Sequence, residues 1–208
     1  MKTLYLAVLI IFISSFSNSQ AQLPTRSIQV MGGYSGHGSG DLKGIVFGAD
    51  FLKYKTNRFF LDYNLRGTIN YGEETIIVNN TITGTTTDAS IRFTTAGVQL
   101  GLNAGYSLVR SKRHEFAVLL GGFGRFQSAS NGSDGYSLYG PQATGQPTIL
   151  VGYDNRTPQN TIAAGAVLQL NYNYTINNKC YIGISPGFQT DTNGDAVTTV
   201  ALVVGRRL

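Results

Sequence analysis

The two histidines are the residues whose chemistry is easiest to test against the sequence. His37 lies in a glycine-rich segment with Ser39 and Asp41 just after it, so a hydrolytic Ser-His-Asp site is one hypothesis. In such sites separate parts of the fold orient each residue, whereas these three are neighbours in one flexible segment. The strand pattern described below places His114 at the opposite end of the molecule. We therefore predict no catalytic residues and no enzymatic activity.

The acidic segment 191–195 is a candidate metal site, because it reads Asp-Thr-Asn-Gly-Asp and resembles the start of a calcium-binding loop. Such a loop also needs a glycine at its sixth position and a glutamate at its twelfth, and both are missing here. The pair Asn193-Gly194 is instead a strong signal for a tight hairpin turn. We predict a turn, with no metal site and no cofactor. Weak binding of divalent cations by the acidic loops stays open as the alternative.

The composition narrows the class of protein. Charged residues make up 13% of the 208 residues, about half the share of a typical soluble domain. The 11% of aromatic residues argues against a disordered chain, which would carry more charge and fewer rings. The single cysteine, Cys180, cannot form an intrachain disulfide, and we expect a packed, unreactive side chain there.

The first 21 residues are typical of a secretory signal peptide. Lys2 is followed by an apolar run over 4–13 and then by small and polar residues up to Ala21. The run is too short for a helical membrane span, which needs about 20 apolar residues. We predict cleavage after Ala21, with a mature domain over 22–208.

Three long segments alternate between apolar residues and polar or small ones. Over 96–108 the even positions are Ala, Val, Leu or Tyr, and the odd positions are Gly, Gln, Asn or Ser. The segments 59–71 and 162–176 repeat this period of two, which is typical of β-strands with one apolar face. All three exceed the roughly five or six residues of a soluble strand and suit the roughly 9–11 residues of a membrane-spanning one.

Five weaker segments of the same kind occur over 27–35, 44–54, 116–126, 180–189 and 197–208. Together with 59–71, 96–108 and 162–176 they make eight predicted strands. Tight turns over 55–58, 111–113 and 177–179 alternate with longer connections such as 72–90 and 128–160. We predict an all-β fold, an eight-stranded antiparallel transmembrane β-barrel with short periplasmic turns and longer outer loops. Ten strands stay open if 72–90 adds two more. Proline cannot donate to a strand ladder, so Pro186 should mark a bulge or a strand end.

With this strand pattern, a predicted leader whose cleavage region reads Gln20-Ala21-Gln22, and a last strand over 197–208, the chain resembles the small outer-membrane barrels of the OmpX/OmpA type. More narrowly, it is similar to the β-barrel outer-membrane proteins of the Bacteroidota. The resemblance implies a location in the bacterial outer membrane, with lipids and the barrel-insertion machinery as partners. The family's last strand usually ends in an aromatic residue, where this chain ends in Leu208.

Charged residues are sorted between the two ends of the predicted barrel. A basic periplasmic rim suited to anionic headgroups comprises Lys53, Lys55, Arg58, Arg110, Lys112, Arg113, Lys179, Arg206 and Arg207, with Arg26 beside them. Acidic residues lie on or near the outer loops at Asp41, Glu73, Glu74, Asp88, Asp134, Asp154, Asp191 and Asp195. A thin basic ring on an exported protein does not suit nucleic acid, so we predict no nucleic-acid partner.

Four further charges fall on the face that points into the barrel, at Asp50, Asp62, Arg66 and Arg125. Buried charges need partners, and eight strands leave room for little more than side chains. We predict that these residues form a luminal polar network that plugs the barrel. A conducting or proton-relaying lumen is the alternative.

Three hypotheses on function follow from this pattern. The first is an outer-membrane scaffold that contacts extracellular ligands or proteins through the loops 72–90 and 128–160. Here 72–90 would protrude as a hairpin with an edge for partner addition. The second is a narrow pore or a transporter of small or apolar ligands. The third is a secreted, soluble barrel of the lipocalin kind, which would carry its apolar face inside.

Overall fold

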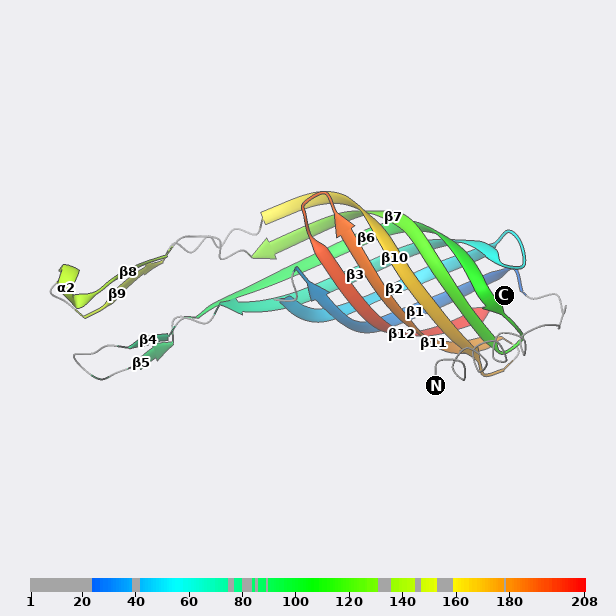
Figure 1. Cartoon of the computed structure of the whole chain (residues 1–208), viewed down its shortest axis with the longest axis horizontal. Helices are drawn as coiled ribbons and strands as arrows, with labels where there is room; N and C mark the ends of the chain where they lie inside the picture. The colour runs from blue at the N-terminus through cyan, green and yellow to red at the C-terminus, as the bar shows by residue number, and fades with distance from the viewer. Residues whose placement is uncertain are drawn as a thin grey trace, which may run out of the picture.

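The computed structural model describes residues 24–38, 42–74, 77–79, 84, 86–88, 90–130, 136–144, 147–152, 159–177 and 179–208. The predicted signal peptide, 1–21, lies outside these residues. Among them, eight antiparallel strands close into a barrel in the order β1-β12-β11-β10-β7-β6-β3-β2 (Figure 1). They are β1 (Arg26–His37), β2 (Leu42–Tyr54), β3 (Phe59–Glu74), β6 (Ile91–Arg110), β7 (His114–Ser130), β10 (Gln159–Thr175), β11 (Cys180–Asp191) and β12 (Ala196–Arg207). The predicted fold class is confirmed.

Side chains alternate along each strand between the interior of the barrel and its outer surface. In β12, for example, Val203 is 1% exposed while its neighbour Leu202 is 71% exposed. The outer surface is apolar, and the interior holds most of the buried polar side chains. A lipocalin-like barrel needs the opposite arrangement, so that hypothesis is wrong. Among the described residues, no helix is long and apolar enough to cross a membrane.

The two ends of the barrel differ in their connections. Tight turns join β2 to β3, β6 to β7 and β10 to β11 at one end of the barrel, which we call the short-turn end. Strands β1 and β12 also meet there, where the Leu208 amide donates a hydrogen bond of 2.8 Å to the Arg26 carbonyl. At the other end, the loop end, two hairpins extend beyond the barrel (Figure 1). They comprise β4 (Ile77–Asn79) with β5 (Thr86–Asp88), and β8 (Tyr136–Tyr139) with β9 (Ile149–Gly152) and the short helix α2 (Pro141–Thr144). Because β4 and β5 form their own sheet, the ten-strand alternative is wrong.

Aromatic side chains gather on the outer surface toward both ends of the barrel. Aliphatic side chains such as Leu100, Leu120 and Leu202 cover the middle. This banding is typical of barrels whose aromatic girdles lie at the two membrane interfaces. The exposed aromatic residues are Phe51, Phe59, Tyr63, Tyr106, Tyr172 and Tyr174 toward the short-turn end, and Tyr34, Phe47, Tyr71, Phe126 and Phe188 toward the loop end.

Two local features of the sheet differ from a regular ladder. The prediction that Pro186 marks a bulge or a strand end is wrong, because β11 continues past it and Pro186 pairs with Val200 of β12. On its other side, β11 pairs with β10, and there the paired residues skip from Gln169–Gly187 to Tyr172–Ile184 with the register unchanged. The proline therefore interrupts the ladder with β10 but not the ladder with β12. A β-bulge does occur elsewhere, between Ser107 and Val109 of β6.

Candidate functional site

The interior of the barrel is the candidate site, and its middle contains three of the four predicted luminal charges. The Arg66 guanidinium Nη2 lies 3.4 Å from Asp50 Oδ1 and 4.0 Å from Asp62 Oδ2. Asp50 also accepts a hydrogen bond from Gln29 Nε2 at 2.7 Å, and the Tyr181 hydroxyl donates to Gln29 Oε1 at 2.9 Å. These side chains come from β1, β2, β3 and β11, so the network joins strands on different sides of the barrel.

The fourth predicted residue, Arg125, belongs to a separate cluster at the loop end. Its Nη2 donates to Asp191 Oδ2, and to Asp195 Oδ2 at 3.0 Å. Gln127 Nε2 donates to Asp195 at 3.3 Å, and His37 Nε2 lies 3.4 Å from the same carboxylate. Arg125 therefore belongs to a cluster at the mouth of the barrel and does not join the Arg66 cluster.

This cluster corrects the predicted placement of two acidic residues. Asp191 and Asp195 face Arg125 inside the mouth and do not belong to an acidic outer surface. Asp191 Oδ1 also accepts the backbone N–H groups of Asn193 and Asp195, which holds the hairpin turn. Gly194 has φ = 81°, so the predicted tight turn is confirmed. Asp41, Asp134 and Asp154 lie outside the described residues.

A third cluster, which the sequence reasoning missed, surrounds Glu115 at the short-turn end. Glu115 Oε1 accepts hydrogen bonds of 2.7 Å from the Tyr54 hydroxyl and of 2.7 Å from the Ser107 hydroxyl. Arg110 Nε lies 3.4 Å from Oε1, and Arg207 Nη2 lies 3.5 Å from Oε2. The Arg110 guanidinium also stacks 3.5 Å above the centre of the Tyr54 ring. One carboxylate thus holds two cations inside the barrel.

The Glu115 cluster removes Arg110 and Arg207 from the predicted basic rim. Their side chains are only 4% and 5% exposed. Arg110 turns inward because the bulge between Ser107 and Val109 reverses the alternation of faces at the end of β6. Arg207 follows the regular alternation of β12, so the period of two alone could have placed it inside. The same period over β7 places Glu115 on the inner face.

The other rim residues lie on the outside at the short-turn end. Lys53 is partly exposed, and the remaining ones are exposed, namely Lys55, Arg58, Lys112, Arg113, Lys179 and Arg206. Cys180 was expected to be packed, but it is exposed on the outer surface beside Arg206, with which it pairs across β11 and β12. The outer face of a membrane barrel leaves a small apolar side chain open to lipid, which explains this difference.

The two histidines lie at opposite ends of the barrel, as predicted. His37 is buried at the loop end, whereas the His114 ring packs 5.2 Å from the Tyr174 ring at the short-turn end. Ser39 and Asp41, the proposed partners of His37, lie outside the described residues. Within the described part of the chain, no three His, Cys, Asp or Glu side chains form a group that could hold a metal ion.

Comparisons with known proteins agree with this geometry. No family model and no curated protein matches the sequence. The chain is similar to the solved structure of Ail, the attachment invasion locus protein of Yersinia pestis, with a TM-score of 0.50, 11% identity, and coverage of 90% of this chain and 100% of that chain. It is also similar to Neisserial surface protein A (NspA), with a TM-score of 0.54, 9% identity, and coverage of 88% of this chain and 97% of that chain.

A second structure of Ail, in complex with the heparin analogue sucrose octasulfate, gives a TM-score of 0.50 at 12% identity over 90% of this chain and 100% of that chain. At these identities the likeness concerns the fold alone. The chain has the fold of the small eight-stranded outer-membrane β-barrel proteins.

Proposed function

We propose that the chain is an integral protein of the bacterial outer membrane and that a signal peptide, cleaved after Ala21, directs its export. The apolar outer surface, with aromatic residues toward both ends, supports this location because lipid tails favour such a surface. The fold shared with Ail and NspA supports it as well. Insertion by the barrel-assembly machinery and kinship with the OmpX/OmpA-type barrels of the Bacteroidota belong to the same proposal.

Within the membrane, the protein acts as a closed scaffold without enzymatic activity. The observation that carries this proposal is the filling of the lumen by paired charges at three levels: Glu115 with Arg110 and Arg207, Arg66 with Asp50 and Asp62, and Arg125 with Asp191 and Asp195. Breaking such buried pairs is costly, so they resist opening.

The functional surface of the scaffold is its loop end, where the loops 72–90 and 128–160 contact extracellular ligands or proteins. The β4–β5 hairpin supports this part of the proposal, since it has strand edges that could pair with a partner. The β4–β5 and β8–β9 hairpins, which lie within these loops, extend from the barrel end that faces outward in the proposed topology (Figure 1).

A narrow pore is the second candidate, and one observation favours it. Several buried luminal atoms have no hydrogen-bond partner in the described structure, including Asp62 Oδ1, Arg66 Nε and Asn103 Oδ1. Buried polar atoms of this kind are common sites for bound water. A continuous file of such water is what a narrow pore needs.

Two measurements test the proposal. A folded barrel should migrate differently in detergent gels before and after boiling, and the absence of a shift would count against the membrane barrel. Purified protein in planar bilayers should then give no reproducible conductance steps. Regular channels of one size would replace the scaffold proposal with the pore.

A further inference from the structure

Three basic side chains lie close together on the outer surface at the short-turn end. Arg26 of β1 and Lys53 of β2 are directly opposite each other in the strand register. Arg206 of β12 is opposite Ile28, one outward position along β1 from Arg26. Arg26 and Arg206 are exposed, and Lys53 is partly exposed. Like charges directly opposite each other destabilise a strand pair, so this arrangement calls for an anion.

Among the described residues, no acidic side chain pairs with these three. None of the ion pairs in this part of the chain involves Arg26, Lys53 or Arg206. The nearest acidic side chains, Asp50 of β2 and Asp62 of the adjacent β3, point into the lumen and pair with Arg66. The three basic side chains therefore remain available to a negatively charged group from outside the protein.

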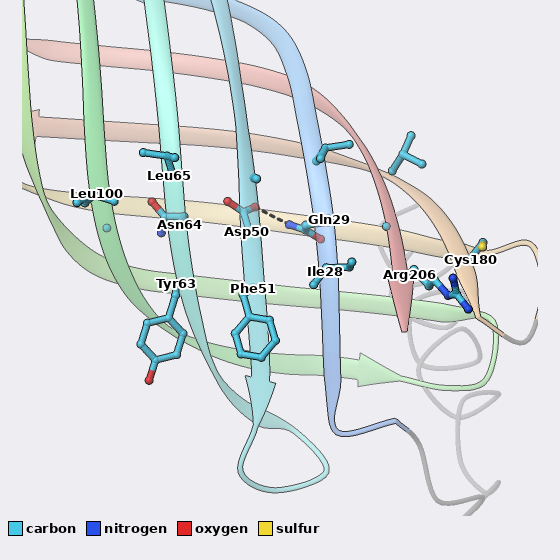
Figure 2. A pocket seen from close by; sticks show the side chains of 15 residues that line it. Ile28, Gln29, Asp50, Phe51, Tyr63, Asn64, Leu65, Leu100, Cys180 and Arg206 are labelled. Carbon is cyan, nitrogen blue, oxygen red and sulfur yellow. Dashed lines mark hydrogen bonds between the residues drawn. The ribbon is translucent and has the colours of Figure 1, made fainter. Parts of the chain in front are cut away.

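A groove of about 890 Å³ on the lipid-facing surface begins beside these charges. Figure 2 shows Tyr63, Phe51 and Ile28 on neighbouring strands, with Arg206 and Cys180 at the end of the row. In the next outward row, Ala49 lies between Val30 of β1 and Leu65 of β3. Its small side chain leaves the hollow between these larger neighbours.

We propose that this groove binds one anionic phospholipid of the periplasmic leaflet. One acyl chain lies along the hollow at Ala49, and the phosphate lies among Arg26, Lys53 and Arg206. A free anion would use the charges but not the apolar groove, so the continuity of the two favours a lipid. This inference rests on the proposed function, because it needs the barrel to be in a membrane.

Cys180 makes the proposal directly measurable. It is the single cysteine of the chain, it is exposed, and it lines the groove beside Arg206. We would attach a small fluorophore to Cys180 and reconstitute the protein in phosphatidylcholine vesicles. Two series of vesicles would contain increasing mole fractions of brominated lipid, which quenches nearby fluorophores. One series would use brominated phosphatidylglycerol and the other brominated phosphatidylcholine.

We expect brominated phosphatidylglycerol to quench at several-fold lower mole fraction than brominated phosphatidylcholine. One basic side chain near an anionic headgroup corresponds to about a fivefold preference, so Arg206→Gln should reduce the preference by about that factor. In the triple variant R26Q/K53Q/R206Q, both lipids should quench the fluorophore equally. Ala49→Phe, which fills the hollow and keeps the charges, should weaken quenching by phosphatidylglycerol.

Two controls separate this site from the general attraction of a basic rim. Lys112→Gln with Arg113→Gln removes two rim charges at the β6–β7 turn and should leave the preference unchanged. A fluorophore on Val118→Cys in a Cys180→Ser background reports on another part of the outer surface and should show no preference. Equal quenching of the Cys180 label by both lipids, or a preference that survives the triple variant, would overturn the lipid site alone. Absence of quenching by either lipid would overturn both the site and the membrane location.

Discussion

Gln99 of β6 and Gln189 of β11 bind each other through two amide hydrogen bonds, each 3.1 Å long, inside the barrel. Two strands, β7 and β10, separate β6 from β11 in the sheet, so the pair crosses the lumen. Both side chains are buried, and each amide satisfies one donor and one acceptor of the other. The pair therefore bridges the lumen with neutral groups.

Replacing Gln189 with alanine should lower the free energy of unfolding by about 1–3 kcal/mol, because the buried Gln99 amide loses its partner. The double variant Q99A/Q189A should lose less than the sum of the two single variants, since no amide is then left unpaired. Urea unfolding in lipid vesicles measures these differences. Strict additivity would show that the two amides do not interact.

Glu115→Gln should be strongly destabilising, by about 3–5 kcal/mol, because Arg110 and Arg207 would lose their shared buried carboxylate. The matched control is Glu73→Gln, which removes an exposed carboxylate 3.1 Å from Arg92 and should cost less than about 1 kcal/mol. The same unfolding assay measures both variants. Similar losses in the two would contradict the role assigned to Glu115.

Gly44→Ala should prevent efficient barrel formation. A β-carbon there would overlap the Ile69 carbonyl of β3, and overpacking of this kind costs about 1–3 kcal/mol or more. Gly32→Ala is the control, because no atom lies within 4 Å of the added methyl group. The folded fraction on unboiled detergent gels should fall for the first variant and stay unchanged for the second.

Leu100→Arg should destabilise the barrel in a bilayer by about 2–4 kcal/mol, because it places a charge near the middle of the apolar outer surface. Leu100 is 68% exposed, so in water the same change would be nearly neutral. Thr198→Arg, on the outer surface near the loop end, should cost no more than about 1 kcal/mol. If both variants unfold alike, the outer surface of the barrel does not contact lipid.

Most of the fold was predictable because it depends on a repeat of period two. All eight strands occur where the alternation placed them, and the structure extends most of them toward the loop end, as in β6, which begins at Ile91 rather than at 96. In β6 the added residues 91–95 read Ile-Arg-Phe-Thr-Thr, with apolar residues at odd positions rather than at the even positions of 96–108, so the pattern breaks before the strand ends. Asp50, Asp62 and Arg66 were placed in the lumen by the same alternation.

The errors arose where one residue changes the phase of the alternation or where strands distant in sequence meet. The bulge after Ser107 turned Arg110 inward, and a local pattern does not show such an insertion. The cluster around Glu115 draws on β2, β6, β7 and β12, and the mouth cluster joins Arg125 to the β11–β12 turn.

The sequence by itself determined where the eight barrel strands lie, their antiparallel order and the ends at which His37 and His114 lie, while the structure excluded two further strands and placed the apolar face outside. The features determined by the sequence follow from local alternation and from the lengths of the connections. Only the tertiary structure decided which luminal charges pair, that Arg110 and Arg207 face Glu115, and that Arg26, Lys53 and Arg206 border an apolar groove. The physical reason is that partners across a closed barrel depend on the shear between strands and on the reach of each side chain, and neither is encoded by the residues of a single strand.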